Sequence, residues 1–136
     1  MAHKPRVTYL NGIFFPVFVG VCFSESDYLA EMKRMGVNEP IDFHSSTASM
    51  KSFTLKNKLT VMICFDPVRH RALHKPQVAA LIAHEAVHVS DAIFCHVGED
   101  NAGDETRAYL VQYIVQETLY MLNCYTKNRR KHGKER

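Results

Sequence analysis

A run of helical apolar spacing between residues 76 and 97 carries the pattern His84-Glu85-Ala86-Val87-His88. Apolar side chains recur every three or four residues through this run, which predicts a long helix with one face packed on a core. Histidines four residues apart share a helix face, so their rings can converge on one metal ion. This one segment therefore predicts both a core helix and a metal-binding face.

Further elements surround this helix. A second apolar stripe predicts another long helix from about 104 to 126, after a polar loop. Strands are predicted at 49–55 and 59–65, and the second run is β-branched and apolar enough for the interior of a sheet. A short helix is predicted at about 25–35, with Ser24 as its N-cap.

The first part of the chain contains an Asn11-Gly12 pair between two apolar runs, 7–10 and 13–15. An Asn-Gly pair in this setting favours a two-residue turn, so we expect a β-hairpin. The apolar stretch 13–23 is well short of the roughly 20 residues that span a bilayer. It is therefore predicted to be a buried strand region, and no membrane association is expected. Residues 37–47 are predicted to form a loop.

Composition limits the number of domains, the cellular location and the role of the basic tail that can be expected. The chain has 136 residues, of which 46% are hydrophobic, which fits one domain. Four scattered cysteines without C-x-x-C spacing suggest reduced thiols in a cytoplasm, and no secretion signal is evident. Six of the 17 Lys and Arg residues lie in the last ten positions. We therefore expect a single domain at 1–126 and a basic, disordered tail at 127–136, with nucleic-acid contact limited to weak binding through that tail.

A catalytic zinc needs three protein ligands and an open position for water, so two histidines are not enough. Glu105 comes 17 residues after His88, at the start of the second long helix. The set His84, Glu85, His88 and Glu105 resembles the gluzincins, the thermolysin-like metallopeptidases with a His₂Glu site, and especially their minimal forms. The resemblance implies one Zn²⁺ bound by the two histidines and Glu105.

The wider sequence is similar to small phage-encoded proteins of this metallopeptidase type. The segments that carry this likeness lie within residues 17–122 and read VGVCFSESDYLAEMKRMG, LIAHEAVHV and GEDNAGDETRAYLVQYIVQETL. The likeness implies an α+β fold with a small twisted sheet packed on two long helices, the zincin-like (minigluzincin) core. It also implies hydrolysis of a peptide or protein substrate in the cytoplasm of a host cell.

The implied mechanism assigns Glu85 as the base. Zinc would lower the pKa of a bound water, and Glu85 would accept its proton and return it to the leaving amine. In zincins an edge strand beside the active-site helix pairs with the substrate, and 59–65 is the candidate. Thermolysin-like enzymes carry an aspartate four residues after the glutamate ligand, whereas this chain has Tyr109. Its hydroxyl could assist an oxyanion, or its ring could simply pack between helices.

Several other polar side chains either border the site or are ordinary surface groups: His44, Asp91, His96 and Asp104. His70 and His74 are also four apart, but the prolines that bracket them favour a loop pair over a second metal site. A different class of function is also open, a catalytically silent zinc-containing module that binds a host protein as an inhibitor or adaptor. Finally, His84 and His88 could merely stabilise a core.

Overall fold

The computed structural model describes residues 7–38, 43 and 46–133. The fold is α+β, as expected, with a mixed sheet and three helices within the described part of the chain. The elements, in chain order, are β1 (Thr8–Tyr9), β2 (Val17–Cys22), α1 (Glu25–Met35), β3 (Ala48–Leu55), β4 (Lys58–Phe65), α2 (Lys75–Val97) and α3 (Asp104–Gly133). Part of the predicted 37–47 loop, including His44, lies outside the described residues.

The sheet has the strand order β1-β2-β4-β3, and only the β2–β4 pair is parallel. The segment between these two strands contains α1 and β3. β3 and β4 form a tight hairpin whose two loop residues, Lys56 and Asn57, have φ values of 49° and 65°. Positive φ at both loop positions matches the right-handed twist of the strands. The predicted strands at 49–55 and 59–65 are thus confirmed.

The connection between β1 and β2 differs from the predicted two-residue turn. The two strands are antiparallel, but residues 13–15 form no strand and neither Asn11 nor Gly12 has positive φ. Instead the Gly12 N–H donates a hydrogen bond to the Tyr113 hydroxyl at 2.7 Å. A Cβ at Gly12 would lie 2.4 Å from that oxygen. Glycine here permits a close contact with α3, which local sequence patterns do not reveal.

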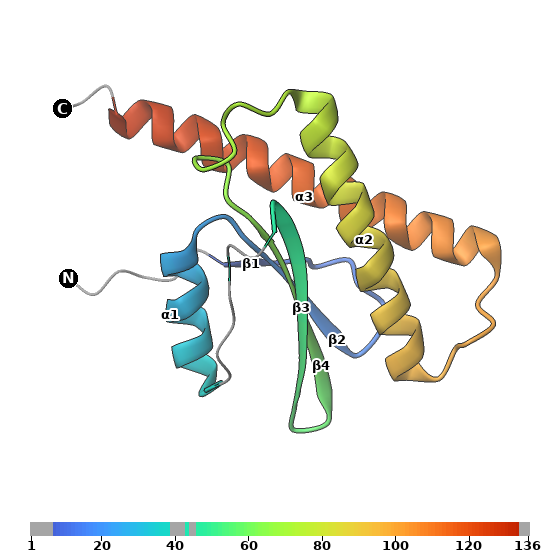
Figure 1. Cartoon of the computed structure of the whole chain (residues 1–136). Coiled ribbons are helices and arrows are strands. Elements are labelled where there is room, and N and C mark those ends of the chain that lie inside the picture. The colour runs from blue at the N-terminus through green and yellow to red at the C-terminus, as the bar shows by residue number, and fades with distance from the viewer. Residues whose placement is uncertain (1–6, 39–42, 44–45, 134–136) are drawn as a thin grey trace.

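Each face of the sheet has its own apolar core. α2 and α3 cover one face, and Val19, Val61, Ala86 and Ile114 are among the buried residues there (Figure 1). α1 covers the other face, where Tyr28 and Met32 pack with β-strand residues. α2 is long and apolar enough to cross a membrane by length and composition alone. Of that apolar window, 39% is buried within the fold.

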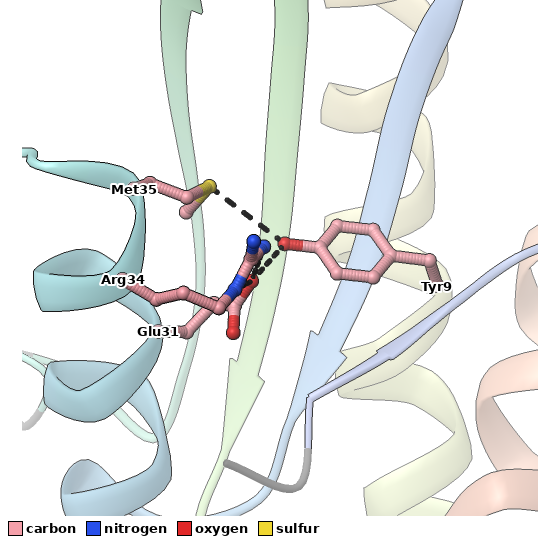
Figure 2. Close-up of polar contacts among 4 residues, drawn as sticks. All are labelled: Tyr9, Glu31, Arg34 and Met35. Carbon is pink, nitrogen blue, oxygen red and sulfur yellow. Dashed lines mark hydrogen bonds and ion pairs between the residues drawn. The ribbon is translucent and has the colours of Figure 1, made fainter.

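A polar cluster joins α1 to β1. Tyr9 of β1 donates a hydrogen bond to the Glu31 carboxylate at 2.9 Å, and Arg34 pairs with the same oxygen (Figure 2). Arg34 and Tyr9 hold the pKa of Glu31 below its ordinary value, against the opposing effect of burial. Burial and Glu31 raise the pKa of Tyr9 to about 12. These contacts fix α1 against the first strand.

α3 is longer than expected. The sequence predicted a helix to about residue 126, but it continues to Gly133, so residues 127–133 are helical and not part of a disordered tail. Lys and Arg are good helix formers, and cationic side chains in the last turn interact favourably with the helix dipole. No glycine or proline lies between Asp104, where the helix begins, and Gly133. The C-terminal part of α3 (red) extends beyond the sheet (Figure 1).

Candidate metal centre

The helix that carries the histidines is well delimited. Pro76 occupies its first turn, where a missing N–H costs nothing, and Gly98 ends it with a φ of 75°. Residues 82, 86, 89 and 93 are fully buried against the sheet. Because His84 and His88 lie on a different face of α2 from these apolar residues, both rings remain at the surface.

The structure brings His84 and His88 together. Their Nε2 atoms are 3.1 Å apart, and the ring centroids are 4.7 Å apart. Two nitrogens at that separation, each at the usual Zn–N distance of about 2.0–2.1 Å, would subtend about 100° at the metal, which is near tetrahedral. The two histidines therefore fit a zinc ion. The same geometry also permits a hydrogen bond between the rings when one is neutral.

Glu85 lies beside this pair and is only 7% exposed. Burial raises the pKa of its carboxyl above the ordinary value, while His84, His88 and the backbone N–H of Met50 oppose that shift. The Met50 N–H belongs to β3, so it ties the carboxylate to the neighbouring strand. Glu85 is thus a positioned, partly desolvated carboxylate next to two imidazoles.

A groove of about 890 Å³ runs between the start of β3 and the outer face of α2. His84, Glu85 and His88 line it on one side and residues 46–50 on the other. The predicted edge strand, 59–65, is wrong, because β4 lies between β2 and β3. Its continuous apolar run is typical of an interior strand. The edge strand beside the histidines is β3.

The expected third ligand is not in place. No third His, Cys, Asp or Glu joins the histidine pair in a metal-sized group within the residues that the structure describes. Glu105 lies in the first turn of α3 and is exposed. It precedes the buried Ile114 by nine residues, which places it about 180° around the helix from the core side. Tyr109, one turn further along, is 66% exposed, so it does not serve as packing in a helix seam.

Arg107 fixes the start of α3 against α2. It donates to the Asp91 carboxylate at 3.0 Å and to the carbonyls of Asp100 and Ala102 at 3.2 and 3.3 Å. Its guanidinium lies 4.9 Å from the ring centroid of Phe94. Asp91 is thus an ion-pair partner of Arg107, a role that the sequence did not indicate. Sequence reasoning missed Arg107, because nothing in the local pattern shows which acid it meets.

The other histidine candidates that the structure describes do not join the pair. The ring of His70 lies 5.9 Å from that of Phe65, and the backbone N–H of His74 bonds to Gln77 at the start of α2. His96 is exposed in the last turn of α2. Asp104 is also exposed, at the N-terminus of α3, where an acidic side chain favours the helix dipole.

Comparisons with protein-family models, with curated proteins and with solved structures found no match to this chain.

Proposed function

We propose that the protein is a zinc-dependent hydrolase, a metallopeptidase of the minimal gluzincin kind with a zincin-like core. One observation carries the proposal: two imidazole nitrogens 3.1 Å apart stand next to a buried carboxylate that lines the same groove. A merely structural histidine pair has no need of such a carboxylate. Zn²⁺ in this place would polarise a substrate carbonyl and lower the pKa of a water molecule.

The chain's own residues then have separate tasks. His84 and His88 hold the ion through their Nε2 atoms. Glu85 accepts the proton of the attacking water and returns it to the leaving amine, and its bond from the Met50 N–H keeps the carboxylate oriented. The groove beside β3 holds the substrate peptide.

Glu105 is the proposed third ligand, and Tyr109 is the proposed donor to the developing oxyanion. The two residues are four apart, so they share one side of the first turns of α3. Both are exposed. Because Glu105 lies on the side of α3 away from the core, the proposal requires that metal binding reorients the first turn of α3 until the Glu105 carboxylate reaches the histidine pair. Glu99, also exposed and close in sequence, supplies a matched control.

Zinc affinity, measured by competition with a chromophoric chelator, tests the ligand set. Glu105→Gln should weaken binding by at least about tenfold, as expected when a charged ligand is lost, whereas Glu99→Gln should have no effect. His84→Ala should abolish stoichiometric binding, and His96→Ala should not. Equal affinity in Glu105→Gln and Glu99→Gln would remove Glu105 from the site.

Peptide cleavage tests the reaction. Glu85→Gln should retain zinc but lose cleavage of an unfolded protein substrate by about a hundredfold or more, because a general base supplies about 10²–10⁴ in rate. Tyr109→Phe should lose about tenfold or more, since oxyanion donors contribute by their hydroxyl.

The second candidate is a catalytically silent zinc-binding module that docks on a host protein. It is favoured by the finding that no third His, Cys, Asp or Glu is grouped with the histidine pair among the described residues. Wild-type protein that binds zinc and cleaves no substrate, with partner binding unchanged in Glu85→Gln, would favour this module over the enzyme.

A further inference from the structure

A second groove, of about 820 Å³, lies between the C-terminal half of α3 and the segment around β1. Five of its 13 lining residues carry a Tyr or Phe ring: Tyr9, Phe23, Tyr113, Tyr120 and Tyr125. It shares no lining residue with the groove that contains the histidines. The proposed hydrolase therefore gives this groove no role.

The aromatic side chains differ in their availability. Phe23 is buried and contacts the ring of Tyr125, with 5.2 Å between centroids. The Tyr113 hydroxyl accepts the hydrogen bond from Gly12. Tyr120 is 66% exposed, which is unusual for so large a ring. The Tyr120 ring is thus open to solvent, whereas Phe23 and Tyr113 are held by contacts within the fold.

Exposed cations lie on α3 beside this groove, although none of them is among its lining residues. Lys127, Arg129, Arg130 and Lys131 are exposed on α3, and the sequence 118–133 contains no Asp or Glu. Lys127 and Lys131 follow Tyr120 by seven and eleven residues, so they lie within about 20° of the same helix face. The guanidinium of Arg129 lies 5.9 Å from the Tyr125 ring centroid, and it donates to the Tyr125 hydroxyl at 3.3 Å.

We propose that this groove binds single-stranded nucleic acid. Unpaired bases stack on exposed aromatic rings, and lysines along the same face neutralise the phosphates that connect them. Asn128, which also lines the groove, offers a donor and an acceptor to base edges. An acidic peptide would satisfy the lysines, but only its aromatic residues could stack on Tyr120, whereas every nucleotide carries a flat base. Glu117 is the one acidic residue in the lining, and it opposes a polyanion.

Fluorescence anisotropy with the full-length chain and a labelled oligo-dT of about 12 nucleotides tests the proposal, because grooves of this kind cover about 4–16 nucleotides. Tyr120→Ala should weaken binding at least about fivefold. Tyr109→Ala is the matched control: that ring is equally exposed at 66%, but lies about 16 Å away along the helix. It should bind as wild type does. Circular dichroism verifies that each variant is folded.

The salt dependence of oligonucleotide binding tests the contribution of the lysines. Lys127→Ala with Lys131→Ala should reduce the slope of log affinity against log salt by about 1.4, because each phosphate contact to a single strand contributes about 0.7. The control pair is Lys33→Ala with Lys75→Ala, two exposed lysines on α1 and α2, which should leave the slope unchanged. Glu117→Gln should tighten binding.

Four results would overturn the proposal: no binding of the oligonucleotide at low salt, equal binding of duplex DNA, equal losses in Tyr120→Ala and Tyr109→Ala, or binding of phosphatidylserine vesicles without binding of the oligonucleotide. The proposal does not depend on the zinc site. Glu85→Gln should bind the oligonucleotide as wild type does, whatever its effect on hydrolysis.

Discussion

Thr118 offers a test of how the helices pack. It is fully buried on α3, and its hydroxyl has no hydrogen-bond partner among the residues that the structure describes. Burying an unpaired hydroxyl costs about 1–3 kcal/mol by protein mutational data. Thr118→Val keeps the shape of the side chain, and the two residues have similar helix propensities. We therefore expect Thr118→Val to raise the free energy of unfolding by about 1–2 kcal/mol.

Urea denaturation followed by circular dichroism measures this change. With an m value of about 2 kcal/mol/M in urea, the midpoint should rise by about 0.5–1 M. A chelator in every sample keeps metal binding from adding to stability. The control is Thr126→Val on the same helix, where the hydroxyl already donates to the Asn123 carbonyl at 3.1 Å, so no gain is expected. A Thr118→Val protein less stable than wild type would refute the reasoning, because the hydroxyl would then have a partner.

Two further predictions concern contacts that position the helices. Glu31→Gln should lower the free energy of unfolding at neutral pH by about 1–2 kcal/mol, since it weakens charge-assisted bonds to Tyr9 and Arg34. The pKa of Glu31 is lower in the folded than in the unfolded protein, so ionised Glu31 stabilises the fold fully at pH values above its unfolded pKa. This stabilisation is lost as the pH falls through the folded pKa. The free energies of unfolding of wild type and Glu31→Gln should therefore become equal in acid. Arg107→Lys should lower the free energy of unfolding by about 1–2 kcal/mol, because lysine lacks the planar guanidinium that bonds Asp91 and two backbone carbonyls at once. It should also speed amide hydrogen exchange in residues 98–103. Unchanged exchange would contradict the role of Arg107 in holding that loop.

The periodic segments of this chain were predictable from sequence. Strong apolar spacing and clear ends, such as Ser24 and Gly36 around α1, identified that helix within its observed bounds. The strands β3 and β4 were predicted from two β-prone runs, and the structure adds that they pair as a hairpin. The connection at Asn11-Gly12 was not predictable, because the glycine serves a contact with Tyr113, about a hundred residues away in sequence. The end of α3 was missed because a charged run resembles a disordered tail when its helical continuation is not considered.

Of the candidate site, only the contacts within one helix were predictable from the sequence. Helical spacing alone brings His84 and His88 together, and the structure has them so. Strand order requires long-range pairing, so the choice of 59–65 as the edge strand was wrong and β3 takes that position. The bond from Met50 to Glu85 depends on how the sheet docks against α2, which no local pattern encodes. The role of Glu105 stays a prediction.

Anomalous diffraction at the zinc absorption edge, on crystals grown with zinc, tests whether the histidine pair binds the ion. We expect one strong peak about 2.0–2.1 Å from the Nε2 atoms of both His84 and His88, with the Glu105 carboxylate as the third protein ligand. A folded protein whose crystals show no peak between these two rings would contradict the proposed zinc site.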